Sequence, residues 1–575
     1  MRNIIFLISF LSFSIMAEAQ LITKFEQSKG LETATYNEVI AYYQQLDKLF
    51  PTIKMEDIGP TDADYPLNAV YYDKDRNFDI KKWKAEGKLI LLINNGIHPG
   101  EPDGVDASMM LLRDAADGKM KIPDNIVLAV IPVYNIGGAL NRNSYSRANQ
   151  NGPEAYGFRG NAENLDLNRD FIKCDANETS SLVQLFHRLD PDLFIDNHVS
   201  DGADYQHVMT LLVTQHNKLG GEVGKYMNDT LVPLLYKDMQ QRGYDLVPYV
   251  NDFEATPENG WTEFYDLPRF SSGFASLFQT FAFVPETHML KPYKQRVDAT
   301  YALMESFIKT ASENADAIKA ARAEDRKTLE QKTELDIDWK PDTTKSTMIT
   351  FKGYESGYKP SKVSGMPRLY YDRSKPYTRQ VKFYNQFTAS KTVIVPKAYV
   401  ISHGWHDVIQ RLEWNGVKMD KLEKDTTMQL TVYRIEKYET VQHPYEKHYL
   451  HKNAIVSAHK ETIKLLKGDY IIPTDQPTRR YLVETLEPTA PDAFFAWNFF
   501  DAVLQQKEGY SDYVFEDEAA ELLKKNPELQ KMLDEKKKSD EAFAKNGDAQ
   551  LKFVYQHSPY FEPEFMRYPV FKIEQ

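Results

Sequence analysis

The segment "NNGIHPGEPDG" places His98 and Glu101 three residues apart, directly after the apolar run "LILLI". A histidine nitrogen and a carboxylate oxygen at this spacing can bind one metal ion, because the turn between them can direct both side chains to one point. A zinc ion that catalyses hydrolysis has three protein ligands, and its fourth position stays open for water. The segment "QHPYEKHYLH" repeats the spacing at His443 and Glu446, so the pattern alone does not identify a site.

Two further candidate residues stand at the ends of apolar runs. His198 follows "DLFIDN", and Glu286 lies in "FAFVPETH". The carboxyl ends of parallel strands meet at one edge of an α/β sheet, so we expect both residues near His98. A carboxylate at the end of a buried strand is costly unless it has a partner or a catalytic task. His443 and Glu446 lack this strand-end context, and we interpret their segment, like "ISHGWHD", as a surface loop with exposed histidines.

A polar stretch between the apolar runs offers groups that bind anions. "NLDLNRDF" contains Asn168 and Arg169, and a planar guanidinium beside an amide can hold a carboxylate. A long polar loop between core strands more often serves a site than not. Three candidate cations lie upstream in "NRNSYSRANQNGPEAYGFRGN", at Arg142, Arg147 and Arg159.

The ordered set of motifs resembles the zinc carboxypeptidase family (carboxypeptidase A-like metallopeptidases). H-x-x-E follows a strand, then come D-x-N-R, a strand-end His and a strand-end Glu, over roughly residues 35–310. The resemblance implies one Zn²⁺ per chain, bound by His98, Glu101 and His198. It also implies that Asp166 orients the first histidine ligand.

The resemblance further implies a function and a substrate. Glu286 matches the general base and acid, and Asn168 and Arg169 match the pair that holds the substrate's terminal carboxylate. We therefore expect a metallocarboxypeptidase that hydrolyses the C-terminal peptide bond of a peptide with a free carboxylate. A zinc amidohydrolase or deacylase, or a peptidoglycan stem-peptide carboxypeptidase, would use the same site. A non-catalytic binding protein with a vestigial zinc site is the alternative from another class.

Two roles in the family have less definite positions here. An arginine ahead of D-x-N-R stabilises the oxyanion, and Arg147 is our choice by context, with Arg142 and Arg159 as rivals. The family also places a mobile tyrosine about two dozen residues before the catalytic glutamate. Tyr265 lies 21 residues before Glu286 (286 − 265) and is the candidate for that substrate-binding role.

Hydrophobic patterning predicts the elements that position these residues. "KLILLINN" and "NIVLAVIPVYN" are typical of strands buried on both faces, and "EPDGVDASMMLLRDAADG" between them predicts a helix. The alternation predicts an α/β fold with a mostly parallel mixed sheet and flanking helices over residues 20–333. A long polar helix is expected near 291–331.

Beyond that helix the pattern changes. "DIDWKPDTTKS" is interpreted as a linker, and the short alternating runs that follow predict a β-rich accessory domain over residues 334–575. Two stretches of its tail are expected to be helical, "DAFFAWNFFDAVLQQ" and "FEDEAAELLKKNPELQKMLDEKKK".

The N-terminus and the composition narrow the setting. "MRNIIFLISFLSFSIMAEAQ" has a positive charge, a short apolar core and a small-x-small end, which predicts a signal peptide at residues 1–19 and a periplasmic or secreted bacterial protein. The apolar core is shorter than the ~20 residues of a membrane span. A net charge of −13 argues against nucleic-acid binding, and Cys174, the single cysteine, excludes an intrachain disulfide.

Overall fold

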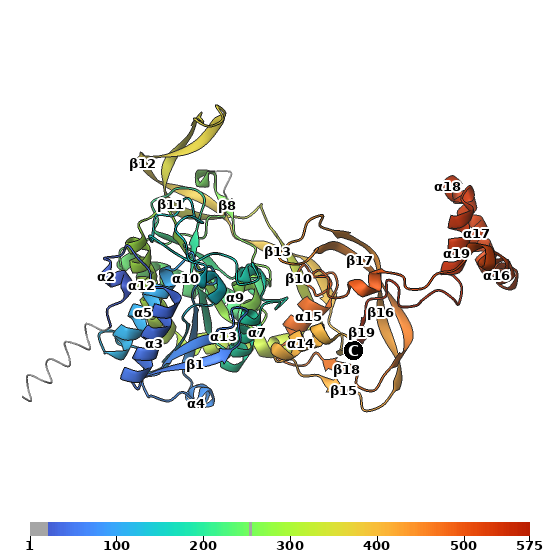
Figure 1. Ribbon diagram of the computed structural model, residues 1–575, viewed down its shortest axis with the longest axis horizontal. Helices are drawn as coiled ribbons and strands as arrows, with labels where there is room; N and C mark the ends of the chain where they lie inside the picture. Colours follow the sequence, from blue (N-terminus) through green and yellow to red (C-terminus); the bar gives the residue numbers. More distant parts are fainter. Residues whose placement is uncertain (1–20, 252–255, 575) are drawn as a thin grey trace, which may run out of the picture.

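The computed structural model describes residues 21–251 and 256–574, so the predicted signal peptide lies outside the described residues (Figure 1). Its centre is an eight-stranded sheet in the order β1-β2-β4-β3-β5-β9-β6, with β7 also paired to β9. Strands β4, β3, β5, β9 and β6 are parallel, whereas β1, β2 and β7 are antiparallel to their neighbours. The predicted fold class is confirmed. The strands are β1 (Ile53–Gly59), β2 (Leu67–Tyr72), β3 (Leu89–Asn94), β4 (Ile126–Ile131), β5 (Leu193–Asp196), β6 (His198–Ser200), β7 (Met209–Val213) and β9 (Phe281–His288).

Two hydrophobic cores cover the two faces of the sheet, as the alternation along β3 shows. Ile90 and Leu92 lie in one core, and Leu89, Leu91 and Ile93 lie in the other. Successive side chains of a strand point to opposite faces, so a continuous apolar run needs burial on both sides. The first core includes α7 (Asn177–Leu189) and α11 (Ser271–Ser276), and the second includes α3 (Tyr36–Leu49), α5 (Asp103–Ala116), α10 (Val232–Gln241), α12 (Tyr293–Glu313) and α13 (Ala315–Gln331).

Shorter helices complete this part of the chain. The expected long helix near 291–331 is two helices, because Asn314, which has a φ of −119°, ends α12 and begins α13. Within the described residues, no helix is both long and apolar enough to cross a bilayer. The shorter helices are α2 (Lys24–Gln27), α4 (Ile80–Ala85), α6 (Ile136–Leu140), η1 (Leu167–Arg169), α8 (His216–Leu219), α9 (Gly221–Tyr226), η2 (Met227–Leu231) and η3 (Pro257–Asn259).

The segment expected to be a linker is instead largely a strand. β10 (Glu334–Pro341) pairs with β13 (Phe387–Ile394), and its Leu335, Ile337 and Trp339 are buried. Their period of two is that of a half-buried strand, and this alternation outweighs the polar residues between them. The next two strands, β11 (Thr347–Pro360) and β12 (Pro367–Tyr384), form a hairpin that joins β8 (Trp261–Thr262) and extends beyond the central sheet in Figure 1.

A second large sheet follows in the order β15-β18-β14-β19-β16-β17. The boundary between residues 333 and 334 stays a prediction, although the first core runs across it: the rings of Phe278 and Tyr481 lie 5.8 Å apart. The remaining elements are β14 (Ala398–Ile401), α14 (His406–Trp414), β15 (Asp420–Lys421), β16 (Thr426–Thr440), β17 (His451–Leu465), β18 (Tyr470–Pro473), α15 (Arg479–Leu486) and β19 (Val570–Ile573).

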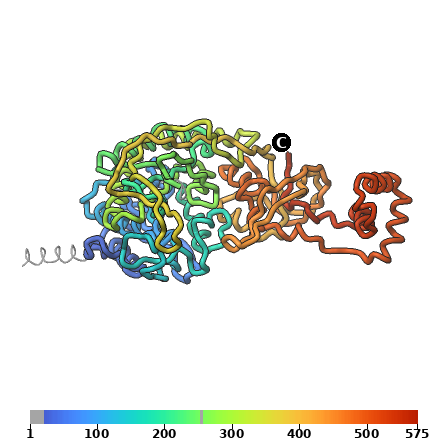
Figure 2. The backbone as a smooth tube through the Cα atoms, turned by 90° about the horizontal axis from the view of Figure 1, so that it is seen from above, coloured from blue at the N-terminus to red at the C-terminus, as the bar shows by residue number. Residues whose placement is uncertain are grey.

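The two tail stretches expected to be helical differ. "DAFFAWNFFDAVLQQ" forms turns and the short η4 (Asp501–Leu504), because its aromatic side chains Phe494, Phe495 and Trp497 are all buried in the first core and Asn498 has a φ of +68°. The second stretch is helical, as predicted. It forms α16 (Asp512–Lys525) and α17 (Pro527–Ser539), which share a small core with α18 (Glu541–Ala544) and α19 (Gly547–Gln556) and stand apart from the sheets in Figures 1 and 2.

Candidate active site

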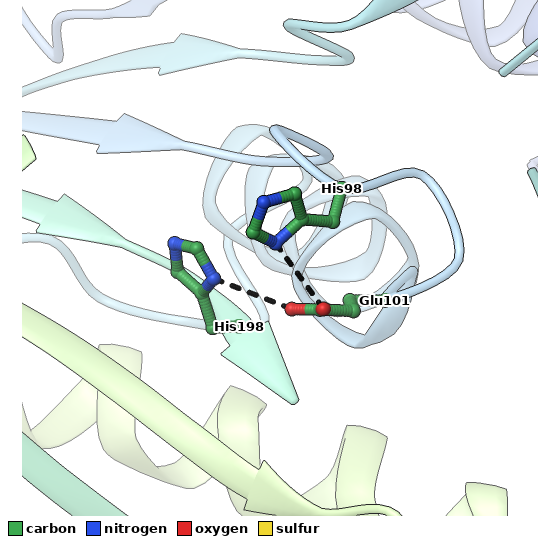
Figure 3. A group of neighbouring side chains, drawn as sticks. All are labelled: His98, Glu101 and His198. Atoms are coloured by element: carbon green, nitrogen blue, oxygen red, sulfur yellow. Dashed lines mark ion pairs between the residues drawn. The ribbon is translucent and has the colours of Figure 1, made fainter. Parts of the chain in front are cut away.

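The carboxyl ends of β3 and β5 bring the predicted metal ligands together at one edge of the sheet. His98 and Glu101 lie in the turn between β3 and α5, and His198 is the first residue of β6. Figure 3 shows each imidazole facing the Glu101 carboxylate, with a dashed line from each ring to a different carboxylate oxygen. In the paired strands β6 and β9, His198 is directly opposite Glu286, which brings the fourth predicted residue to the same edge.

The three side chains converge through the atoms that could bind an ion. Nδ1 of His98 is 3.2 Å from Oε1 of Glu101, and Nδ1 of His198 is 3.3 Å from Oε2. All three ligand atoms lie within 4.8 Å of one another, and all three residues are buried. Burial opposes ionisation of Glu101, but the positive charge of Arg147 and the two imidazoles outweigh it and hold the pKa of this carboxyl well below its usual range.

A carboxylate holds the far nitrogen of each histidine. Nε2 of His98 is 2.9 Å from Oδ1 of Asp166, and Nε2 of His198 is 2.9 Å from Oδ2 of Asp196. Such pairs fix the tautomer, because the proton stays on Nε2 and the Nδ1 lone pair points inward. Sequence reasoning found Asp166 but missed Asp196, although a strand-end carboxylate two residues before a ligand was visible in "FIDNH".

The donor set fits a zinc ion. Nδ1 of His98 is buried and makes no hydrogen bond within the described residues, which leaves a free lone pair directed at the other two ligand atoms. Two imidazole nitrogens and one carboxylate oxygen are a common ligand set of catalytic zinc. Across residues 21–251 and 256–574, these three residues form the one group of this kind.

A cavity of about 550 Å³ opens beside the three ligands. Glu286 lies in its wall, and burial raises the pKa of this carboxyl to about 8; the nearby His198 opposes that rise and the charge of Glu101 adds to it. The cavity wall combines polar and apolar side chains, among them Arg147, Arg159, Asn168, Arg169, Leu212, Tyr249, Phe264, Phe270, Val284 and Met289.

Comparison with known proteins gives relatives of one kind. No family model matches the chain. It is 23% identical over 430 residues to carboxypeptidase 2 of Trichophyton equinum, which covers 71% of this chain and 73% of that protein. Carboxypeptidase 2 of Trichophyton rubrum is 22% identical over 433 residues, with the same coverage. The chain is thus similar to carboxypeptidases over more than two thirds of its length. The predicted resemblance and enzyme class, a metallocarboxypeptidase, are thus confirmed.

Solved structures of carboxypeptidases are also similar. Carboxypeptidase A from Helicoverpa armigera is 16% identical, covers 54% of this chain and 82% of its own, and has a TM-score of 0.39. A metallo-carboxypeptidase from Burkholderia cenocepacia is 13% identical, covers 49% of this chain and 70% of its own, and has a TM-score of 0.36.

Two of the three arginines considered for the oxyanion role reach this carboxypeptidase site. Arg147 pairs with Oε1 of Glu101, and Arg159 lies 2.9 Å from Asp166 and 3.7 Å from Glu101. Arg142 does not reach the site, because its guanidinium donates to the backbone carbonyls of residues 33 and 34. The choice of Arg147 stays a prediction, with Arg159 as its rival.

The Asn168–Arg169 pair lies at the cavity wall in a fixed arrangement. Oδ1 of Asn168 accepts a hydrogen bond of 3.1 Å from the backbone N–H of Ser271. The guanidinium of Arg169 stands 4.7 Å from the ring centre of Phe270, and its Nη1 donates to the backbone carbonyl of Asn168 at 2.8 Å. Stacking on the ring orients the guanidinium while leaving other N–H groups free for an anion.

Tyr265, the predicted substrate-binding tyrosine, does not line the cavity. The hydroxyl of Tyr265 is 3.2 Å from Oδ1 of Asp338 in β10, and its ring packs on Phe387, so its side chain is directed away from the cavity. Tyr249 lines the cavity instead, 37 residues before Glu286 (286 − 249), which is outside the expected spacing. Burial, with the charge of Glu286, holds the pKa of Tyr249 well above its usual range, so its hydroxyl is a neutral donor.

The C-terminal segment interpreted as an exposed loop contacts this site. Oε2 of Glu446 accepts a 2.8 Å hydrogen bond from the backbone N–H of Asp166. Nε2 of His448 is 2.7 Å from Asp175, and its side chain is 15% exposed. His451 is buried, so the expectation of exposed histidines fails at both residues. His443 is exposed, as expected. Nothing in the local sequence signals these contacts, since the partners lie more than 270 residues apart.

Proposed function

We propose that this protein is an exported zinc carboxypeptidase that releases the C-terminal residue of peptides. One observation carries the proposal: the three metal-ligand candidates, Glu286 and the Asn168–Arg169 pair all line one cavity. The sequence "MRNIIFLISFLSFSIMAEAQ" supports export.

A zinc ion at His98, Glu101 and His198 would supply the electrophile that polarises a peptide carbonyl and acidifies a water molecule. Glu286 would take a proton from the attacking water and pass it to the leaving amine. A general base must be ionised, and a divalent cation beside Glu286 would lower its pKa from the raised value of about 8.

The cations of the cavity favour a substrate with a free carboxylate. Arg169 and Asn168 would hold that carboxylate through a charge-assisted pair and an amide donor. Arg147 or Arg159 would stabilise the negative charge that develops on the carbonyl oxygen, an effect of about 3–4 kcal/mol for one such donor in other enzymes. A carboxylate held next to the reacting bond restricts cleavage to the end of the chain.

The test uses two peptides that differ only in a free or an amidated C-terminus. The zinc-loaded protein should release one amino acid from the free peptide and act at least about 100-fold more slowly on the amide, which lacks the charge that Arg169 binds. Glu286→Gln should lower kcat by about 10²–10⁴-fold. Glu222→Gln, which changes an exposed carboxylate on α9, should match the wild type.

Equal rates on both peptides, or an unchanged kcat in Glu286→Gln, would contradict the proposal. Preferential cleavage of acylated amino acids over peptides would instead support the deacylase.

A further inference from the structure

The C-terminal region contacts residues beside the candidate active site at two points. One is the loop 443–451, between β16 and β17, and the other is the segment 492–497, which follows α15. The loop contacts the turn Asp166–Arg169 directly, and the segment contacts Arg269, two residues before the Ser271 that binds Asn168 of this turn. The turn carries Asp166, which holds His98, and the predicted substrate-binding pair Asn168 and Arg169.

At the first point, Glu446 is linked to the candidate ligand His98 through one intervening residue, Asp166. Its Oε2 accepts the backbone N–H of Asp166 at 2.8 Å, and Oδ1 of Asp166 in turn holds Nε2 of His98 at 2.9 Å. Oδ2 of Asp166 is occupied by Arg159 at 2.9 Å. The backbone of Asp166 is thus fixed from the C-terminal region while its carboxylate is fixed on the site side. A shift of this backbone would move the His98 ring.

The loop that carries Glu446 is itself firmly held. Tyr445 and His448 pair across a two-residue turn, with backbone hydrogen bonds of 2.7 and 3.1 Å. Glu446 and Lys447 in that turn have φ values of +49° and +74°, a conformation that favours Asn-Gly and costs other residues about 1–2 kcal/mol each. Strain of this kind persists where the surroundings impose it and collects at functional sites.

Side-chain contacts also hold the last two residues of the turn. His448 pairs with Asp175 at 2.7 Å, and Lys447 pairs with Glu163 at 3.3 Å. Glu163 precedes Asp166 in the sequence and Asp175 follows it, so the turn contacts the chain on both sides of the Asp166–Arg169 segment.

At the second point, the C-terminal region holds Arg269. Asp492 accepts the Arg269 backbone N–H at 2.8 Å and its guanidinium at 2.6 and 2.9 Å, and Trp497 stacks on that guanidinium at 4.8 Å. Two residues along, the N–H of Ser271 donates to Asn168 at 3.1 Å. The amide predicted to bind substrate is therefore also positioned through contacts made by the C-terminal region.

We propose that Glu446 is a positioning residue of the metal site, and that the region beyond residue 333 is an integral part of the catalytic unit. Glu446 fixes Asp166, and Asp166 fixes the ring of His98. The expected change in kcat rests on the proposed function. The expected change in zinc release follows from the contacts of Glu446 and Asp166 alone.

The experiment compares Glu446→Ala, Glu446→Gln and His443→Ala in the full-length zinc-loaded protein. Glutamine keeps an acceptor oxygen, alanine removes it, and His443→Ala changes an exposed residue of the same loop. Direct partners of metal-ligating histidines alter metal affinity by about 10–100-fold, so a residue one step further out should change zinc release to a chelator by about 3–10-fold. Glu446→Ala should show that acceleration and a lower kcat with little change in KM; the other two should match the wild type.

Zinc release from Glu446→Ala at the wild-type rate would overturn the proposal, as would a Glu446→Gln variant as impaired as alanine. A lower Tm of metal-free Glu446→Ala with unchanged zinc release would assign Glu446 a purely structural role and also overturn it. If the wild-type protein cleaves no peptide, the proposed function fails, whereas the zinc-release comparison still decides the role of Glu446.

Discussion

Asp196 offers the sharpest test of how the site holds its metal. Its Oδ2 lies 2.9 Å from Nε2 of His198, and its Oδ1 accepts a 2.9 Å hydrogen bond from Nδ2 of Asn94. The residue is 1% exposed, so water does not replace either partner. Asp196→Ala would therefore leave two buried donors unpaired.

The expected loss can be worked out for two substitutions. A hydrogen bond to a charged group is worth about 1.5–3 kcal/mol and a neutral one about 0.5–1.5, so Asp196→Asn should weaken zinc binding by about 1–1.5 kcal/mol, or roughly 10-fold. The oxygen of the new asparagine can still accept from His198. If the Asn94 amide flips, its Oδ1, which makes no hydrogen bond within the described residues, can accept from the NH₂ of the new asparagine. Asp196→Ala should cost at least about 2.7 kcal/mol, or roughly 100-fold.

The assay is zinc competition with a chromophoric chelator, with thermal unfolding of the metal-free proteins as a check on folding. Asp325→Asn is the matched control, because Asp325 is a buried aspartate that accepts the backbone N–H groups of residues 222 and 223 on α9. It should lower Tm without changing the zinc Kd. Equal zinc affinity in Asp196→Ala and the wild type would refute the assignment of Asp196 to the metal site.

Three further predictions concern single residues. The Cys174 thiol should not react with a thiol reagent until the protein unfolds, because it is 2% exposed and burial raises its pKa; rapid reaction of the native protein would contradict this. Tyr249→Phe should lower kcat/KM by about 10-fold for loss of one hydroxyl donor, whereas Tyr265→Phe should leave kcat/KM unchanged and cost about 1 kcal/mol of stability in urea unfolding; the reverse order would restore the original choice. Burial would raise the pKa of Asp190, but the charges of Arg322 and Arg326 outweigh it and lower this pKa to about 2. The ionised carboxylate therefore stabilises the fold fully above the unfolded pKa of about 3.9, and this stabilisation is lost as pH falls toward 2. Asp190→Asn should thus destabilise the protein at pH 6 but progressively less toward pH 2, as measured by urea unfolding at each pH.

Most of the central sheet, and the grouping of the candidate metal ligands, could be predicted from the sequence, and the reason is physical. Strands such as β3 are buried on both faces, so they appear as continuous apolar runs whose ends are sharp. His98 and His198 stand at those ends, and parallel strands bring such ends to one edge. The ordered motifs then separated this site from the same spacing at His443.

The features that were missed depend on contacts the local pattern does not contain. Tyr249 lines the cavity although its distance from Glu286 in the sequence is outside the expected spacing. Glu446 contacts Asp166, which lies 280 residues away in the sequence. β10 is different, because the alternation of Leu335, Ile337 and Trp339 is visible in the sequence, although the residues between them are polar as in a linker. The aromatic stretch 492–506, predicted as a helix, forms turns instead, because Phe494, Phe495, Trp497 and Phe500 are all buried.

The most direct measurement of the central claim is the zinc content of His98→Ala and His443→Ala after dialysis against metal-free buffer, by mass spectrometry of the metal. The two variants remove the first histidine from the two segments that share one spacing. His443→Ala should retain one zinc ion per chain and its peptidase activity, and His98→Ala should lose both. Retention of stoichiometric zinc by His98→Ala together with its loss from His443→Ala would contradict the account.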